Sequence, residues 1–351
     1  MNDIMEHVRA GGRIEGADWL TLAREATLHE LGFLAHGIRQ RLHPEPLVTY
    51  VIDRNINYTD ICVSGCKFCA FFHAPGEGGA VLPREELARK NEETKALGGT
   101  QILLQGGLHP DLPLSFYEDM LHFMKGLGIH VHGFSPPEIH HFAQISGLPT
   151  REVIRRLMAA GLDSIPGGGA EILNNRVRRE LAPKKCDADE WIRIMGEAHE
   201  LGLKTTATMM FGHIETLEER LEHLQRVRDL QDKTRGFTAF IPWPFQPDNT
   251  PLAKARRMEK ATAVEYLRML ALSRIFLDNV PNIQASWVTQ GPKIAQLSLF
   301  FGANDFGSTM IEENVVAAAG VRFRLSEAEI RRLVSDAGFT PRQRLMDYTL
   351  V

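Results

Sequence analysis

Three cysteines close together in the sequence are the residues best suited to chemistry. Cys62, Cys66 and Cys69 form a C-x3-C-x2-C pattern, whereas the fourth cysteine, Cys186, has no partner at ligand spacing. Thiolates suit iron, and three of them can bind three irons of a cubane while the fourth iron stays open to a small molecule. The spacing therefore predicts a 4Fe-4S cluster whose open iron can bind an amino and a carboxylate group.

A structural zinc site is the alternative interpretation of the same cysteines. His73 or Cys186 would then be the fourth ligand, because structural zinc sites are closed by four ligands. Zinc ligands usually come as two pairs along the sequence, and this chain has a single group. Phe68, Phe71 and Phe72 surround the loop and would limit oxidation of a cluster. The sequence favours the cluster over zinc.

Composition narrows the class of protein further. The chain has 351 residues, of which 44% are hydrophobic, enough to bury a large core. The formal net charge is -4 and the pI is near 6.4, with acidic and basic residues interspersed, so no nucleic-acid-binding surface is indicated. No segment approaches the roughly 20 apolar residues that span a bilayer. We expect a cytoplasmic protein that binds neither nucleic acid nor membranes.

The elements that must position the cysteines follow a regular alternation. Short apolar or β-branched runs predict strands at 48–57, 101–105, 130–134, 162–166, 204–211, 237–242, 282–287 and 303–307. Amphipathic segments predict helices at 84–97, 115–127, 150–160, 187–201, 216–231, 261–279, 290–301 and 311–319. Such alternation requires a parallel sheet with crossovers, and eight repeats predict an α/β fold, a (β/α)8 TIM-type barrel. Catalytic residues of this fold follow the C-terminal ends of the strands.

Three parts of the chain are expected. Residues 1–45 have a helical pattern and form an N-terminal extension, residues 46–320 form the barrel, and residues 321–351 form a C-terminal helical cap. The cysteines then lie on the loop that leaves the first barrel strand.

Cysteines spaced in this way after a first barrel strand resemble the radical S-adenosylmethionine (SAM) superfamily. Within it, the chain resembles the cyclic dehypoxanthine futalosine synthase family of menaquinone biosynthesis by the futalosine pathway. The resemblance covers residues 20–325, and the strings IPGGGAEIL and FIPWPFQP favour this family over its sisters, the aminofutalosine synthases and the deazaflavin-cofactor synthases. The segments that carry it include DRNINYTDICVSGCKFCAF (53–71), DSIPGGGAEIL (163–173), FTAFIPWPFQP (237–247) and GANDFGSTMIEENV (302–315).

The resemblance implies a set of contacts to SAM after strands two to five. A glycine-rich turn after the second strand would bring backbone carbonyls to the ammonium group of SAM, because glycine permits close approach. Polar residues after the third and fourth strands would bind its ribose and amino acid parts, and the segment after the fifth would pack beside adenine. Each carboxylate could instead be a solvated surface group or a helix-terminal acid. The predicted contacts are Gln105, Gly106, Gly107, Ser135, Glu138, Glu171, Gly212 and Glu215.

Substrate contacts are predicted from position at the barrel mouth. A benzoate and a ribose need an aromatic wall together with amides and hydroxyls. The predicted contacts are Asn55, Asn57, Tyr58, Trp243, Gln246, Ser286, Thr289, Gln290 and Asn304. Asp305 is the candidate to accept a proton from the ring, with capping of the following turn as its alternative role. Five histidines (His109, His132, His140, His141 and His213) could contribute, but a lone histidine more often has a structural role.

The implied reaction begins with one-electron reduction of SAM to methionine and a 5'-deoxyadenosyl radical. The radical takes hydrogen from the ribose 4' carbon of dehypoxanthine futalosine, and the resulting carbon radical adds to the benzoate ring. Loss of an electron and a proton restores aromaticity. The resemblance also implies an electron donor such as flavodoxin or ferredoxin. A sister radical reaction, or a non-catalytic zinc-binding role, is the alternative.

Overall fold

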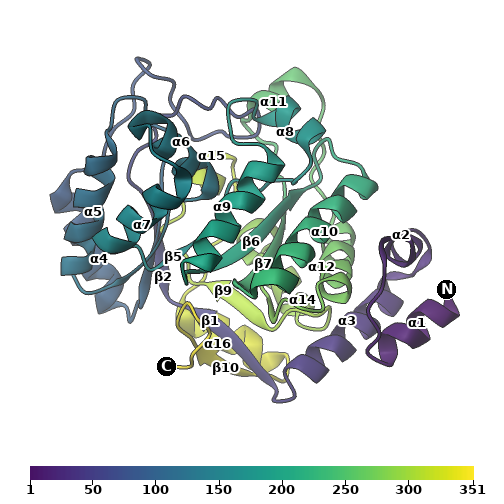
Figure 1. Cartoon of the computed structure of the whole chain (residues 1–351). Helices are drawn as coiled ribbons and strands as arrows, with labels where there is room; N and C mark the ends of the chain where they lie inside the picture. Colours follow the sequence, from purple (N-terminus) through teal and green to yellow (C-terminus); the bar gives the residue numbers. More distant parts are fainter.

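The chain folds around a barrel of parallel strands, described for residues 1–351 by a computed structural model (Figure 1). Seven consecutive strands, β2 to β8, form one parallel sheet in sequence order. The strands are β1 (Leu47–Val51), β2 (Asp53–Asn57), β3 (Gln101–Gln105), β4 (His130–Gly133), β5 (Ser164–Ile165), β6 (Lys204–Phe211), β7 (Phe237–Pro244), β8 (Asn282–Ile283), β9 (Asp305–Ser308) and β10 (Thr340–Gln343).

β9 closes the barrel between the first and last strands of this sheet. Its edge toward β8 is joined by the bonds Asn304 N to Ile283 O (3.1 Å) and Ala285 N to Asp305 O (2.9 Å). On its other side β9 pairs in parallel with β1, and the bond from Thr309 N to Val51 O (2.9 Å) continues this contact. Because β1 and β2 are consecutive, the predicted eight-stranded (β/α)8 barrel is confirmed.

Helices surround the barrel. They are α1 (Asn2–Arg9), α2 (Gly16–Glu25), α3 (Leu28–Leu42), α4 (Arg84–Ala96), α5 (Leu114–Gly126), α6 (Pro136–Ser146), α7 (Thr150–Ala160), α8 (Asn175–Leu181), α9 (Ala188–Glu200), α10 (Leu217–Thr234), α11 (Pro251–Ala255), α12 (Ala263–Phe276), α13 (Trp287–Gln290), α14 (Pro292–Ser298), α15 (Val315–Ala318) and α16 (Glu327–Asp336). Reciprocal side-chain caps begin α3, α10 and α16, each with Glu three residues after Ser or Thr. None of these helices is both long and apolar enough to cross a membrane.

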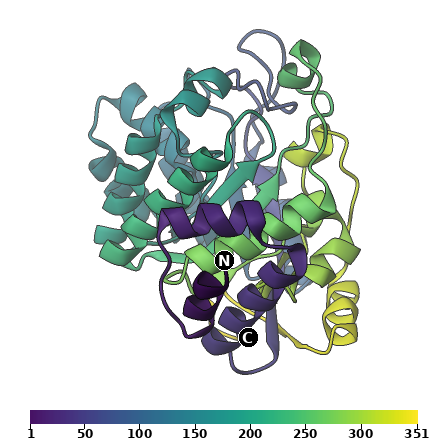
Figure 2. The ribbon, with the colours of Figure 1, turned by 90° about the vertical axis from the view of Figure 1, so that its right-hand side faces the viewer.

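The N-terminal helices α2 and α3 pack on the outside of the barrel against α12, and α1 packs against α3 (Figure 2). Trp19 is fully buried there, and its indole N–H donates to the carbonyl of Leu272 at 3.2 Å. Arg268 of α12 donates to the carbonyls of Ala26 and Ala23 at 2.7 and 2.8 Å. Both carbonyls lie at the end of α2, where backbone acceptors have no intrahelical partner.

Three features differ from the sequence-based expectation. The expected strand 48–57 is interrupted at Ile52 and forms β1 and β2. The segments of α6, α8, α11 and most of α13 were not predicted as helices. The C-terminal segment contains not only a helix, α16, but also β10, which pairs in parallel with β1 at the base of the barrel (Figure 1). The sequence of β10, TPRQ, has no apolar alternation, so its pattern could not indicate a strand.

Candidate active site

The three clustered cysteines lie on one loop that leaves the C-terminal end of β2. The backbone N–H groups of Ser64 and Leu108 donate to Cys62 Sγ at 3.4 and 3.3 Å, and Ser64 Oγ lies 3.0 Å from Cys66 Sγ. All the cysteines are free, and Cys186 is buried just before α9, outside this loop. Hydrogen bonds to sulfur are one way in which proteins tune iron-sulfur clusters. The donor set and its surroundings therefore fit a cluster held by three thiolates.

The glycine turn after β3 packs directly against the cysteine loop. A Cβ added at Gly107 would lie 2.2 Å from the carbonyl oxygen of Ile61, and one at Gly106 would lie 2.5 Å from the ring of Tyr58. Neither position has room for a side chain, because the obstacle is backbone in one case and a buried ring in the other. The turn therefore lies beside the cysteines, where its backbone can approach a ligand of the open iron.

Glu138 supports this turn from behind. One carboxylate oxygen accepts the Gly106 N–H at 3.0 Å and the Tyr58 hydroxyl at 2.8 Å, and the other accepts the N–H and hydroxyl of Ser135 at 2.7 and 2.6 Å. Burial raises the pKa of Glu138. We predicted direct SAM contacts for Ser135 and Glu138, but neither side chain lines the cavity described below. Their hydrogen bonds begin α6 and position the glycine turn, and direct contact with SAM stays a prediction.

Glu171 is held at the cavity wall by two cations. Its carboxylate contacts the Lys185 ammonium at 2.8 Å and the Arg178 guanidinium at 3.2 Å. Burial alone would raise the pKa of Glu171, but these two cations hold it below the usual value. Its backbone adopts a left-handed conformation with φ of 41°, which is uncommon for a residue other than glycine. The strained backbone and the paired cations fix the carboxylate at the end of the glycine run 167–169.

Glu215 organises the turn after β6. Its two carboxylate oxygens accept the N–H groups of Gly212 and His213 at 2.6 and 2.9 Å, and Arg220 donates to it at 2.8 Å. Burial opposes its charge, yet the His213 contact, the guanidinium and the backbone donors together hold its pKa well below the usual value. Neither Gly212 nor Glu215 lines the cavity, and the contact of this turn with adenine stays a prediction.

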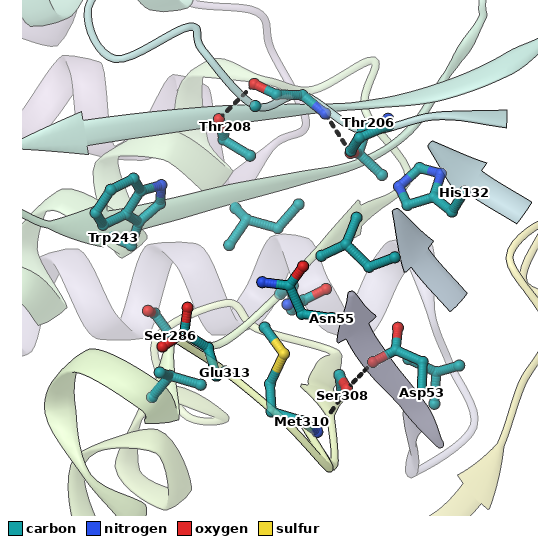
Figure 3. A pocket seen from close by; sticks show the side chains of 18 of the residues that line it. Asp53, Asn55, His132, Thr206, Thr208, Trp243, Ser286, Ser308, Met310 and Glu313 are labelled. Atoms are coloured by element: carbon teal, nitrogen blue, oxygen red, sulfur yellow. Dashed lines mark hydrogen bonds between the residues drawn. The ribbon is translucent and has the colours of Figure 1, made fainter. Parts of the chain in front are cut away.

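A cavity of about 300 Å³ occupies the interior of the barrel (Figure 3). Trp243 of β7 lies at one side of it and His132 of β4 at the other. The buried amide of Asn55 has an oxygen without a protein partner, and the hydroxyls of Ser286 and Thr289 lie 2.7 Å apart. The predicted site residues that the structure brings together here are Asn55, Gln105, Glu171, Trp243, Ser286 and Thr289.

The other predicted substrate contacts do not line the cavity. Tyr58 packs in an aromatic cluster behind the glycine turn, and Asn57 donates to the carbonyl of Gln105 at 3.3 Å. Gln246 donates to a nearby backbone carbonyl, and the Asn304 amide is engaged by buried polar neighbours. Gln290 ends α13 away from the cavity. These differences have one physical reason. A position near the end of a strand does not determine which side of the strand a side chain occupies.

Asp305 lies below the cavity rather than in it. Its carboxylate accepts from the Arg344 guanidinium at 2.5 and 3.1 Å, from the Thr49 hydroxyl at 2.6 Å and from the Gly307 N–H at 2.8 Å. The residue is fully buried and does not line the cavity. This corrects its expected position facing the substrate, because both carboxylate oxygens are engaged by Arg344 of the C-terminal segment and by Thr49 and Gly307.

Several cavity residues were not predicted. Thr206 and Thr208 point inward from β6 and bond to the N–H and the carbonyl of Gly167 at 2.9 and 2.7 Å (Figure 3). Glu313 and Arg344 also line the cavity. Alternation of threonines along the strand 204–211 was the signal for the first pair, since residues two apart share a face. No comparable pattern marks Glu313 or Arg344.

Comparison with known proteins agrees with this geometry. The profile of the Radical SAM superfamily matches residues 56–227, and the profile of the CofH/MqnC C-terminal region matches residues 234–351. The FeFe-hydrogenase maturase HydG from Carboxydothermus hydrogenoformans has a similar fold, with a TM-score of 0.77, 18% identity, and coverage of 99% of this chain and 80% of that one. The fold and the cysteine loop are those of a radical SAM enzyme, which uses a 4Fe-4S cluster and SAM.

Full-length relatives narrow this class. A cyclic dehypoxanthine futalosine synthase from Halalkalibacterium halodurans is 46% identical over 100% of this chain and 95% of its own length. An aminodeoxyfutalosine synthase from Thermus thermophilus is 43% identical over 97% of this chain and 93% of its own length. The chain belongs to the family of the cyclic dehypoxanthine futalosine synthases and their sister enzymes within the radical SAM superfamily.

Proposed function

We propose that this enzyme converts dehypoxanthine futalosine to cyclic dehypoxanthine futalosine in the futalosine pathway of menaquinone biosynthesis. The observation that carries the proposal is the full-length match, at 46% identity, to a synthase of that name. The cavity supports it, because an aromatic wall beside an amide and two hydroxyls suits a substrate with a benzoate and a ribose.

Cys62, Cys66 and Cys69 would hold the cluster, and the Gln105–Gly107 turn with Glu171 would hold SAM. When bound, these groups supply the 5'-deoxyadenosyl radical that takes hydrogen from the ribose 4' carbon, and they accept the electron that the product must lose. The chain's own task is to place that carbon against the ring and to exclude other hydrogen donors. A site enclosed within the barrel serves this purpose.

Trp243, Asn55, Ser286 and Thr289 are the residues that we propose orient the substrate. Trp243 offers a flat apolar surface to a ring. The free amide oxygen of Asn55 can accept a hydrogen bond from a substrate hydroxyl. The paired hydroxyls of Ser286 and Thr289 can both donate and accept. These groups come from three different loops or strands, so a bound substrate would span the cavity.

The remaining assignments are also proposals. A flavodoxin or ferredoxin is the proposed electron donor, in the cytoplasm. The proposed organisation is an N-terminal extension to residue 45, a barrel to residue 320 and a C-terminal cap that contributes the strand β10 to the barrel base.

The experiment is anaerobic reconstitution with iron and sulfide, followed by incubation with SAM, a reductant and dehypoxanthine futalosine. We expect one 5'-deoxyadenosine for each cyclised product, both identified by mass spectrometry. The substrates of the aminofutalosine and deazaflavin-cofactor sister enzymes serve as controls. Deoxyadenosine formation that responds only to a sister substrate would reject the cyclase assignment and retain the radical SAM class.

A further inference from the structure

A buried chain of hydrogen bonds leads from the cavity toward the base of the barrel. His132 Nδ1 lies 2.7 Å from the Ser164 hydroxyl, and His130 Nε2 lies 2.7 Å from the same hydroxyl. His130 and His132 are two residues apart on β4, so they share the inner face. Ser164 lies on the neighbouring strand β5, where it pairs with His132. A hydroxyl can donate one proton and accept another, so it can connect two imidazoles.

His132 and His130, the two ends of this series of hydrogen bonds, lie in different surroundings. His132 lines the cavity (Figure 3), and its bond to Ser164 uses Nδ1, which leaves Nε2 for a ligand. His130 is only partly buried, at the first residue of β4, and the charges of Asp163, Lys125 and Asp347 act on it there. The chain therefore connects the enclosed site with the solvent-exposed N-terminal end of the barrel.

We infer that His132 Nε2 accepts the proton that the substrate ring loses after cyclisation, and that Ser164 and His130 relay a proton to the base of the barrel. The inference rests on the proposed function, which requires such a proton loss. His132 is the group that would touch the reacting atom, and Ser164 and His130 act through it.

Protons and electrons balance in the step that restores the aromatic ring. After ring closure the attacked carbon carries one hydrogen too many, and the ring holds one unpaired electron. Breaking that C–H bond sends its proton to His132 Nε2 and returns its electron pair to the ring, so one surplus electron must leave to a one-electron acceptor, the oxidised iron-sulfur cluster. His132 then donates its Nδ1 proton to Ser164, the Ser164 hydroxyl donates to His130 Nε2, and His130 releases its Nδ1 proton to solvent.

The groups around the His132–Ser164–His130 hydrogen bonds favour release of the proton from His132 over its retention there. Burial lowers the pKa of His132 to about 3, with His130 and Arg344 adding to the effect, so the imidazole is neutral. In the tautomer whose Nδ1–H donates to the Ser164 hydroxyl, Nε2 carries the free lone pair. Burial also lowers the pKa of His130, and Lys125 acts in the same direction, whereas Asp163 and Asp347 oppose it. The carboxylates of Asp163 and Asp347 therefore favour a proton on His130, at the outer end of the relay.

The other titratable groups of the cavity are engaged. Asp53 accepts from Ser308 and Gln101, and the Glu313 carboxylate accepts three successive backbone N–H groups. Glu171 is paired with two cations, as described above. Burial raises the pKa of Tyr348, so it keeps its proton. Among these titratable groups, only His132 presents a neutral ring nitrogen that can take a proton.

The decisive variant is His132→Asn, because the Asn amide can keep the bond that Nδ1 makes to Ser164 while Nε2 is removed. With dehypoxanthine futalosine, we expect deoxyadenosine formation within about twofold of wild type, since cofactor cleavage and hydrogen abstraction precede proton loss. The yield of cyclised product per deoxyadenosine should fall at least tenfold, and a substrate-derived organic radical should accumulate in freeze-quenched samples by electron paramagnetic resonance.

The relay is tested separately from the acceptor. Ser164→Ala and His130→Gln should lower the same product ratio by a smaller factor, and Ser164→Thr, which retains a hydroxyl, should recover it. His199→Gln is the control, because His199 is a partly buried imidazole that also bonds to two hydroxyls, those of Thr234 and Thr205, and does not line the cavity.

Three outcomes decide the inference. A wild-type product ratio in His132→Asn would overturn it, as would an equal fall in the His199→Gln control. If His132→Asn does not fold, His130→Gln at the edge of the barrel carries the test, and a normal ratio there would reject the relay. Absence of cyclised product from the wild-type enzyme would instead reject the proposed function, so the two failures are distinguishable.

Discussion

The guanidinium of Arg344 and the carboxylate of Asp305 form a fully buried ion pair, with contacts of 2.5 and 3.1 Å, between the end of β10 and the start of β9. The pair lies below the cavity that Arg344 lines, and it connects the C-terminal segment to the strand that closes the barrel. Residues 39 positions apart in the chain thus complete the floor of the site.

This pair predicts a structural rather than a chemical effect of Asp305→Asn. Removing one partner of a buried pair leaves the other charge unpaired, which typically costs about 3–5 kcal/mol. Urea denaturation should show that loss in the free energy of unfolding. Asp336→Asn, which breaks the exposed pair with Arg332, should cost less than about 1 kcal/mol. The ratio of cyclised product to deoxyadenosine should stay normal in Asp305→Asn, and a selective fall would restore Asp305 as the ring base.

Local patterns were sufficient to predict the barrel and the cysteine loop. Each strand and helix of a (β/α)8 fold has its own periodicity, and three cysteines within eight positions need no distant partner to be recognised. The orientation of loop residues was not predictable in the same way. Tyr58 directly follows β2 and Asn304 directly precedes β9, yet both side chains point into packed surroundings. Arg344 enters the site from a polar strand that only the folded barrel places beside β1.

The histidine pair on β4 shows a second limit of the sequence. His130 and His132 alternate along a strand, so a shared face was predictable. Their link through Ser164 depends on the register between β4 and β5, which brings together residues 32 positions apart. Register is set by packing of the whole sheet and is not encoded in either segment alone.

Replacement of each clustered cysteine should remove the cluster. Cys62→Ala, Cys66→Ala and Cys69→Ala should each lose most of the bound iron after anaerobic reconstitution, together with deoxyadenosine formation, because three thiolates hold the cluster. Cys186→Ala should keep both, since Cys186 lies outside the loop. Iron analysis and the brown absorbance of the cluster provide the measurement. Full iron content in any of the first three variants would contradict the ligand assignment.

Glu171→Gln should weaken the binding of SAM more than the binding of the substrate. The carboxylate lies beside the glycine run and is held in place by Lys185 and Arg178, so neutralising it removes one charged contact and releases two cations. A lost charge-assisted hydrogen bond corresponds to about 1.5–3 kcal/mol, or roughly a 10- to 100-fold rise in the SAM dissociation constant. Glu180→Gln, on the partly exposed face of α8, is the control. A larger effect on substrate affinity than on SAM affinity would reject the assignment.

Stability should fall with acid because of His223, a buried histidine that does not line the cavity. Burial lowers the pKa of His223 to about 3, from an ordinary value of 6.5, and Arg178 and Arg226 add to the effect. The unfolded state then binds more protons between these values, so the stabilising contribution is complete above pH 6.5 and is lost as the pH falls toward 3. The loss is about 1.4 kcal/mol for each pH unit.

His223→Asn removes this titration while its amide oxygen can still accept the Leu173 N–H. Unfolding free energies from urea titrations at pH 6.5, 6.0 and 5.5 should show the advantage of wild type over the variant shrinking by about 1 kcal/mol over this range. His29→Asn, on the exposed surface of α3, should leave the pH dependence unchanged. Parallel pH profiles for wild type and His223→Asn would show that the unfolded and folded proton affinities of His223 are equal.

Gly107→Ala should separate the cysteine loop from the turn that supports it. The new Cβ would lie 2.2 Å from the carbonyl oxygen of Ile61 and 3.0 Å from Cys62 Cβ, so the loop must move. Backbone cannot yield as a flexible side chain does, and we expect a reduced iron content together with at least tenfold weaker SAM binding in the protein that retains iron. Gly126→Ala, at the end of α5 with nothing within 4 Å of the added Cβ, should be neutral or slightly stabilising because alanine favours helix. Wild-type iron content and SAM affinity in Gly107→Ala would show that the two loops can separate without cost to the site.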